Sequence, residues 1–277
     1  MPPIQKGRPI IKQRIITALI LLPLLIGFIG YANATWFALL IAGACGLALV
    51  EFYAMSLAAE RSGERALAIG TGVLLPLCCL AGAQAIPAAL TLVVLLFATL
   101  FLFRFGDLAK VVQHLSLVLL GYLYIPVLLS HMVLLRELPY GREWIFLVLV
   151  VVMAGDTSAY FTGINFGRRK LYPAISPNKS VEGALGGLAG SVFGAALASA
   201  AFLPVLSWLD CLVVGLGLGA LGQVGDLFES MLKRSFGVKD SGRMIPGHGG
   251  ILDRLDSLLF AFPAAYYFAL LKFAGQG

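Results

Sequence analysis

Charged residues are scarce in this sequence: Asp, Glu, Lys and Arg together make up 12% of its 277 residues. Soluble domains carry about 25% charged residues. Apolar residues account for 60% of the chain, and its mean hydropathy is +0.93. This composition excludes an ordinary water-soluble globule and indicates a protein of the lipid bilayer.

Cysteine is also rare, and its placement excludes a cysteine-bound metal site. The four cysteines lie in or beside apolar segments, and none has the spacing of a metal-binding motif. We therefore interpret Cys45, Cys78, Cys79 and Cys211 as small apolar residues within the membrane.

Long apolar runs fill most of the chain, and a helix needs about 20 such residues to cross a bilayer. Nine segments are candidates, at approximately 15–31, 35–57, 66–82, 86–103, 111–135, 143–163, 184–206, 209–232 and 251–273. Lipid cannot hydrogen-bond to open backbone groups, so these segments are expected to be helical. The sequence predicts an all-α, polytopic integral membrane protein with about nine transmembrane helices.

The basic residues indicate how these helices are oriented. With nine helices and the N-terminus inside, 16 of the 20 Lys and Arg residues fall on the cytoplasmic side. This asymmetry follows the positive-inside rule. The net charge of +6 is therefore explained by topology, and no nucleic-acid partner is predicted. Residues 32–34, Ala-Asn-Ala, resemble a signal-peptide cleavage site, but the length of the preceding apolar run favours a retained first helix.

Polar chemistry is concentrated in the second half of the chain. Residues 1–140 read as an N-terminal scaffold of transmembrane helices, in which Glu51 is the only acid inside an apolar segment. We interpret Glu51 as a packing or interfacial residue. Residues 141–277 read as a C-terminal catalytic region within the same membrane domain.

Acidic residues inside membrane segments are costly and usually functional. Five of them lie in or at the ends of the predicted helices of the second half: Asp156, Asp226, Glu229, Asp253 and Asp256. One helical face carries small residues and then charged ones at steps of three or four, namely Gly215, Gly219, Gly222, Asp226, Glu229 and Lys233. Such a stripe, polar at its cytoplasmic end, predicts a site that is reached from the cytosol.

A glycine-rich turn, Pro246-Gly-His-Gly-Gly250, leads into the last helix, where backbone N–H groups favour phosphate binding. The loop before it carries four basic residues, and the segment 168–170 adds three more on the same predicted side. Carboxylates alone would suggest proton transport. Carboxylates together with cations and a glycine turn indicate Mg²⁺ and a polyphosphate.

The stretch SMLKRSFGVKDSGRMIPGHGGILDRLD, at 230–256, resembles the signature of the phosphatidate cytidylyltransferase family along its whole length. A second segment, Ser176-Pro177, Lys179-Ser180 and Glu182-Gly183, is similar to another part of that family, where Thr often replaces Ser180. The resemblance covers roughly 150–260. It implies a Mg²⁺-dependent nucleotidyltransferase of phospholipid biosynthesis that joins CTP to phosphatidate, giving CDP-diacylglycerol and pyrophosphate. It also implies the cytoplasmic (inner) membrane, a cytosol-facing site and a homodimer.

The roles that we assign within these motifs fall into three groups. The catalytic residues are predicted to be Asp226, Lys233, Asp253 and Asp256, and Asp226 and Asp253 are the predicted metal ligands. The predicted substrate-binding residues are Ser176, Lys179, Ser180, Ser230, Arg234, Lys239, His248, Gly249 and Gly250.

Simpler roles remain open for several of these residues. Asp226 and Asp253 could form structural ion pairs with Arg254 or Lys233, and the lysines of the 233–250 loop could merely set topology. Asp156 could belong to the site or pair with a cation between helices. The glycines at 186, 190 and 194 are expected to form a helix contact or a dimer face.

Two other functions remain open. A CTP-dependent lipid-alcohol kinase would transfer the γ-phosphate and would need a base for a hydroxyl group. An ion-coupled transporter would also use intramembrane acids, but such proteins often contain repeated halves, and we find no repeat here.

Overall fold

A computed structural model describes residues 23–58, 61–104, 106, 108–242, 244 and 249–273 of the chain. Eight helical spans in these residues are long and apolar enough to cross a membrane. They are α2 (Ala34–Ser56), α3 with η2 (Ser62–Cys78 and Cys79–Ala81), α4 (Ala85–Arg104), the continuous α5, η3 and α6 (Leu108–Tyr122, Leu123–Val127 and Leu128–Arg136), α7 (Gly141–Phe166), α8 (Val181–Ala201), α9 (Trp208–Ser235) and α10 (Leu252–Phe273). A short antiparallel hairpin, β1 (Lys170–Tyr172) and β2 (Ser176–Ser180), joins α7 to α8.

The all-α membrane fold predicted from the sequence is confirmed. Each of the eight apolar segments after the first corresponds to one of these spans. The first predicted segment, 15–31, lies partly outside the described residues, and its described part, 23–31, is helical. The chain is therefore a multi-pass membrane protein.

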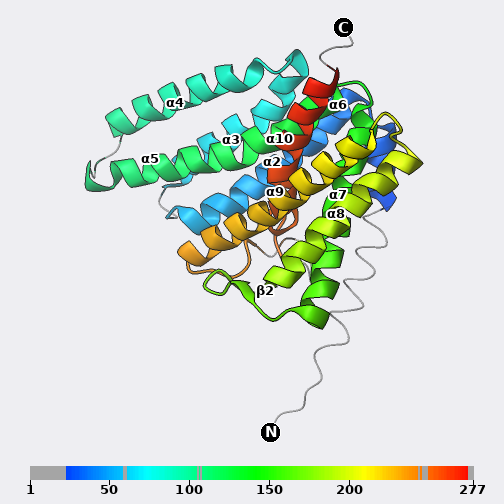
Figure 1. The fold of residues 1–277 in the computed structure, drawn as a ribbon. Coiled ribbons are helices and arrows are strands. Elements are labelled where there is room, and N and C mark those ends of the chain that lie inside the picture. The colour runs from blue at the N-terminus through cyan, green and yellow to red at the C-terminus, as the bar shows by residue number, and fades with distance from the viewer. Residues whose placement is uncertain are drawn as a thin grey trace.

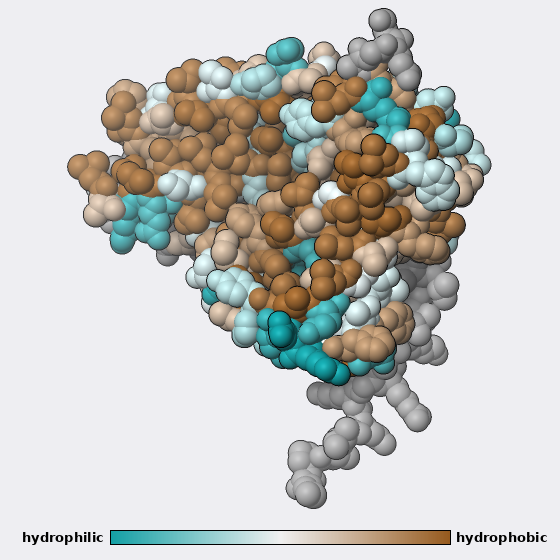
Figure 2. Space-filling view, viewed as in Figure 1, coloured by the Kyte–Doolittle hydropathy of each residue, from teal (hydrophilic) through white to brown (hydrophobic). Residues whose placement is uncertain are grey.

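The spans form a bundle from which α4 and α5 extend to one side (Figure 1). In the same view α2, α9 and α10 lie in the middle, and α7 and α8 lie on the side away from α4. Apolar side chains cover most of the visible face, and hydrophilic side chains gather at the end of the bundle that carries the hairpin (Figure 2). An apolar surface of this extent is what contact with lipid requires.

Glycine allows α7 and α8 to pack closely. A Cβ atom at Gly186 or Gly190 of α8 would collide with Thr162 or Ser158 of α7, and one at Gly194 would lie 3.0 Å from the Ala154 Cβ. These three glycines therefore form an ordinary helix contact within the bundle, one of the two roles predicted for them.

The N-terminal half of the chain packs directly on the helices that carry the acids. Tyr124, in the π-helical turn η3, places its ring 5.2 Å from that of Phe228 on α9 and 6.4 Å from that of Phe260 on α10. The two halves thus share one core, and the division at residues 140 and 141 remains a prediction.

Candidate active site

Helix ends bring the functional side chains together at one end of the bundle. There α7 ends, α8 begins, α9 ends and α10 begins, and the hairpin lies across them. Two groups of charged residues result: one around Asp226, which lines a cavity, and one around Lys233, which is buried.

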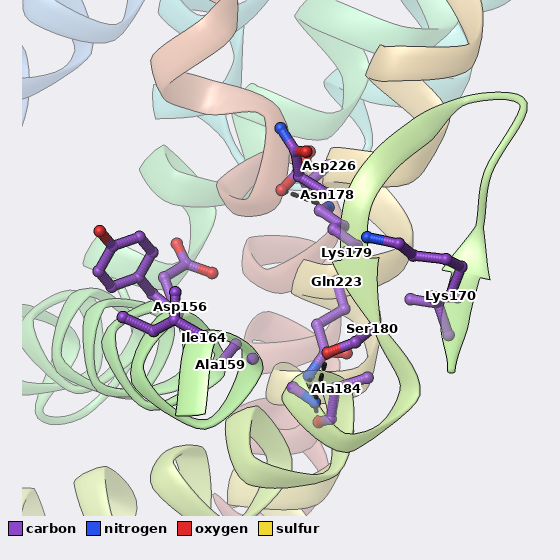
Figure 3. A pocket seen from close by; sticks show the side chains of 14 residues that line it. Asp156, Ala159, Ile164, Lys170, Asn178, Lys179, Ser180, Ala184, Gln223 and Asp226 are labelled. Carbon is purple, nitrogen blue, oxygen red and sulfur yellow. Dashed lines mark hydrogen bonds and ion pairs between the residues drawn. The ribbon is translucent and has the colours of Figure 1, made fainter. Parts of the chain in front are cut away.

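The cavity has a volume of about 590 Å³ and lies between α7, α8, α9 and the hairpin (Figure 3). Lys179 of β2 forms an ion pair with Asp226 of α9, with Nζ 2.5 Å from Oδ2. Asp156 of α7 lines the same cavity, and Ser230 donates a hydrogen bond of 3.4 Å to Asp226 Oδ1. The acids and the lysine come from three different elements, so only the folded bundle assembles them.

The cavity wall is amphipathic. Lys170 adds a second ammonium group to its polar side, while Ile164 and Leu171 contribute apolar surface. Tyr160 and Ile164 are also 66% and 62% exposed, on the part of α7 that is open to the surroundings of the bundle. A ligand that is anionic at one end and apolar at the other would match this lining.

The hairpin is held in place by the first turn of α8. The Glu182 carboxylate accepts hydrogen bonds from the backbone N–H groups of Arg168 (3.0 Å) and Arg169 (3.2 Å). Ser180 is the N-cap of α8, because its hydroxyl accepts a 3.1 Å hydrogen bond from Gly183 N. These contacts fix the strand that carries Lys179.

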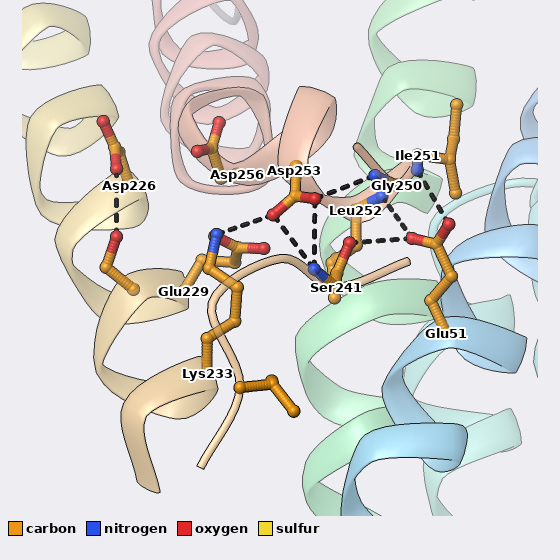
Figure 4. A network of polar contacts seen from close by, with 12 residues as sticks. Glu51, Asp226, Glu229, Lys233, Ser241, Gly250, Ile251, Leu252, Asp253 and Asp256 are labelled. Carbon is orange, nitrogen blue, oxygen red and sulfur yellow. Dashed lines mark hydrogen bonds and ion pairs between the residues drawn. The ribbon is translucent and has the colours of Figure 1, made fainter. Parts of the chain in front are cut away.

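In the second group one lysine contacts two carboxylates (Figure 4). Lys233 forms an ion pair with Glu229, one turn earlier on α9, and a second one with Asp253 of α10, 2.6 Å from Oδ1. Glu229 is 1% exposed and Lys233 is buried, so these charges are shielded from water. The expected alternative of an ion pair between Asp253 and Lys233 is therefore present, whereas Asp226 pairs with Lys179.

Asp253 also organises the loop that precedes it. Its carboxylate accepts hydrogen bonds from Gly250 N (2.8 Å) and Ser241 N (3.1 Å). The next two N–H groups, of Ile251 and Leu252, donate to Glu51 of α2, each at 3.0 Å. Of the glycine turn predicted to bind phosphate, Gly250 thus already donates its N–H to a protein carboxylate, while 246–248 lie outside the described residues, so phosphate binding by this turn remains a prediction.

Asp256 connects the two groups. It lies one turn after Asp253 on α10 and, in Figure 4, between Asp226 and Asp253. Its carboxylate accepts a 2.7 Å hydrogen bond from Ser257 N. It thus places a further acid between the two groups.

The remaining predicted site residues are spread over the surrounding loops. Gly249 adopts a φ of 83°, which favours glycine. Arg234 donates to Val238 O at 2.9 Å, and Lys239 is exposed in the same loop. Ser176 begins β2 and does not line the cavity, and His248 lies outside the described residues. Their predicted contacts with substrate remain predictions.

Sequence reasoning gave no site role to Gln223, missed the position of Glu51, and counted Lys170 only as part of a basic segment. Lys170 and Gln223 both line the cavity, and Gln223 donates to Ala184 O at 3.0 Å. Gln223 lies three residues before Asp226 in an apolar helix, a spacing that could have revealed it. Glu51 gave no such signal, because its partners lie about 200 residues further along the chain.

The donor set is suited to a hard divalent cation. Within the described ranges no three Asp, Glu, His or Cys side chains converge closely enough to enclose a metal by themselves. Mg²⁺ needs no such cage, since one or two carboxylates usually hold it together with water and substrate phosphates. Asp226 fits this role, being 30% exposed in the cavity wall, whereas Asp253 is 10% exposed and fully engaged. Binding of Mg²⁺ by these two residues remains a prediction.

The fold and these groups define a polytopic membrane protein with a charged, amphipathic site at one end of its bundle. Comparison with known proteins specifies the class further. Residues 12–271 match the model of the cytidylyltransferase family. The chain is 38% identical to the phosphatidate cytidylyltransferase of Pseudomonas aeruginosa over 277 aligned positions, which cover 96% of this chain and 99% of that protein. It is 42% identical over 181 residues to the phosphatidate cytidylyltransferase of Bacillus subtilis, covering 64% of this chain and 67% of that protein.

The chain therefore belongs to the cytidylyltransferase family and is a nucleotidyltransferase.

Proposed function

We propose that this membrane protein transfers the cytidylyl group of CTP to phosphatidate, which yields CDP-diacylglycerol and pyrophosphate. The observation that carries the proposal is the amphipathic cavity at the hairpin end of the bundle, which Lys179 and Asp226 line together with the apolar side chains of Ile164 and Leu171. The full-length match to a phosphatidate cytidylyltransferase supports the same reaction.

The chemistry requires positioning and neutralisation of charge rather than a strong base. An oxygen of the phosphatidate phosphate attacks the α-phosphorus of CTP. A P–O bond forms there, and the bond to the bridging oxygen breaks as pyrophosphate leaves. A phosphate monoester loses its second proton with a pKa of about 6, so the nucleophile is already deprotonated at neutral pH. The remaining obstacle is the repulsion between two anions.

The protein's own cations reduce this repulsion. Lys179 and Lys170 line the cavity from the hairpin and would contact phosphate oxygens there. Asp226 would hold Mg²⁺ from the cavity wall, and Asp253 would join it by giving up one of its present hydrogen bonds. The bound ion would neutralise triphosphate oxygens. Lys233 keeps the two acids beside it in place and pairs its positive charge with Asp253.

The amphipathic wall explains how a lipid and a nucleotide could meet. The acyl chains would remain in lipid beside the exposed side chains of Tyr160 and Ile164, while the phosphate reaches the lysines. CTP is water-soluble and would enter from the cytosol, so we place the charged end at the cytosolic face of the inner membrane. A homodimer is part of the proposal, and mass measurement of the purified protein in detergent tests it.

The decisive test is an assay of purified protein with labelled CTP, phosphatidate and Mg²⁺. The proposal requires label in CDP-diacylglycerol and release of pyrophosphate. In a parallel assay with diacylglycerol in place of phosphatidate, a lipid-alcohol kinase would instead release CDP and form a lipid phosphate, whereas a transporter would give no labelled lipid in either assay. Either of these results would contradict the proposal.

A further inference from the structure

Glu51 is a buried acid of α2, the one acid of the described N-terminal spans that reaches the loop between α9 and α10. It is 5% exposed. Its Oε1 accepts a 3.0 Å hydrogen bond from Ile251 N, and its Oε2 accepts bonds from Leu252 N at 3.0 Å and Ser241 Oγ at 2.9 Å (Figure 4). A membrane helix of the N-terminal half thus supplies a carboxylate to the first turn of α10.

The chemistry of this contact is that of a helix cap supplied by another helix. The first N–H groups of a helix have no partner within it, and its N-terminus carries a partial positive charge. A carboxylate buried at that position is stabilised by the same donors that it satisfies. Removing the charge of Glu51 would leave the start of α10 without this anchor.

A short chain of hydrogen bonds connects Glu51 to the site. Ser241 donates its hydroxyl to Glu51 and its backbone N–H to Asp253. Asp253 in turn contacts Lys233. A Cβ atom at Gly242 or Gly250 would collide with the Glu51 carboxylate, so glycine at both positions lets the loop close around it.

The neighbouring residue of α2 holds the other end of the same loop. Phe52 packs edge to face on Phe236, which follows α9, with ring centroids 6.0 Å apart. Two successive residues of α2 therefore fix both the exit of α9 and the entry of α10. These are the two helix ends that carry Lys233 and Asp253.

We propose that Glu51 is a positioning residue of the enzyme: through Ser241 and the first turn of α10 it sets the orientation of Asp253 and Lys233. The inference rests on the proposed cytidylyl transfer. It gives the N-terminal half an indirect part in catalysis, which its composition did not indicate.

The test compares Glu51→Gln with Glu64→Gln in purified protein. Glutamine keeps the shape of Glu51 but turns an NH₂ group toward N–H donors, so we expect kcat/KM to fall about tenfold or more. The Mg²⁺ concentration that gives half-maximal rate should rise, and the stabilisation of the protein by Mg²⁺ and CTP in a melting experiment should weaken. Glu64 pairs with Arg61 at the start of α3, and its variant should behave as the unmodified protein.

A double-mutant cycle separates positioning from mere stability. Ser241→Ala removes the hydroxyl bond to Glu51 but leaves the backbone bond to Asp253. If Glu51 acts through Ser241, the effects of the two substitutions on kcat/KM are not additive. Additive effects, or a Glu51→Gln variant with normal kinetics and Mg²⁺ dependence per folded molecule, would overturn the inference. Failure of the unmodified protein to form CDP-diacylglycerol would instead count against the proposed function.

Should Glu51→Gln fail to fold, Ser241→Ala provides the deciding measurement. A reduced kcat/KM with an increased Mg²⁺ requirement in this milder variant supports the positioning role. Normal values of both contradict it.

Discussion

Lys233 carries one positive charge and pairs with two carboxylates. Its partners Glu229 and Asp253 come from α9 and α10, and all three side chains are at most 11% exposed. A buried charge is stable only when it is paired, and loss of one partner from such a pair costs about 3–5 kcal/mol. Lys233 therefore joins two helices as well as providing positive charge near the site.

We predict that Lys233→Ala raises the apparent KM for CTP and lowers the melting temperature. The first effect follows from the loss of a charge near the triphosphate, and the second from two carboxylates left without a cation. Extra Mg²⁺ should not restore the KM. Lys110→Ala, at the exposed start of α5, is the control. Unchanged CTP saturation and maximal rate would remove Lys233 from the site.

Variants of Asp226 and Asp253 should differ in thermal stability, although we expect both to lose activity. We expect Asp226→Asn and Asp253→Asn each to abolish activity, because both are predicted to hold Mg²⁺. Asp226 and Lys179 are each 30% exposed, and such a pair contributes about 0–1 kcal/mol. Asp253→Asn weakens a buried set of contacts, with Lys233 and with the N–H groups of Gly250 and Ser241, so only this variant should melt markedly earlier. Near-normal activity of both variants at ordinary Mg²⁺ would contradict the metal assignment.

At the scale of elements, the close packing of α7 against α8 determines the shape of the cavity that both helices line. Asp156 lies on α7, and Lys179 lies on β2, directly before α8. The distance between these two side chains therefore depends on how closely the two helices approach. Glycine permits that approach because it has no Cβ atom.

A substitution in this contact should therefore disturb folding. We predict that Gly190→Val lowers the yield and the melting temperature of the protein in detergent, since its side chain would meet Ser158 and the Ala154 carbonyl of α7. Gly217→Val on α9 is the matched control, because no atom lies within 4 Å of a Cβ there. Equal melting temperatures of the two variants would show that α7 and α8 can move apart without loss of stability.

At the scale of the whole molecule, charged groups lie at both ends of the bundle but differ in kind. At the far end Lys272 pairs with Asp210 at 2.5 Å, and Arg136 donates to the carbonyls of Ile29 and Ala32, each at 2.8 Å. These contacts tie helix ends together. The end with the cavity instead carries the acids and lysines of the candidate site.

The orientation of the molecule follows from the basic residues and can be tested directly. Nine helices with a cytoplasmic N-terminus place the C-terminus outside. A phosphatase reporter that folds only outside the cytoplasm should be active when fused after Gly277. The same reporter fused after Lys239 should be inactive. Cytoplasmic behaviour of the Gly277 fusion would contradict the odd number of helices.

The sequence by itself determined the membrane class, the positions of the described spans and the family. These properties depend on local quantities: the length of an apolar run, which must match the bilayer, and an unbroken motif at 230–256. It also indicated that Asp226, Lys233 and Asp253 belong near one another, because they lie at the facing ends of two consecutive helices.

Only the tertiary structure determined which charged side chains form ion pairs with each other. Helical spacing put Lys233 on the face of Asp226, but the packing of α10 turns it to Asp253, and the hairpin brings Lys179 to Asp226 instead. Glu51 illustrates the limit most clearly, because Ser241 lies 190 residues away in the sequence. No local pattern encodes such a contact: it exists because α2 packs beside the start of α10, where a buried carboxylate satisfies N–H groups that the helix cannot.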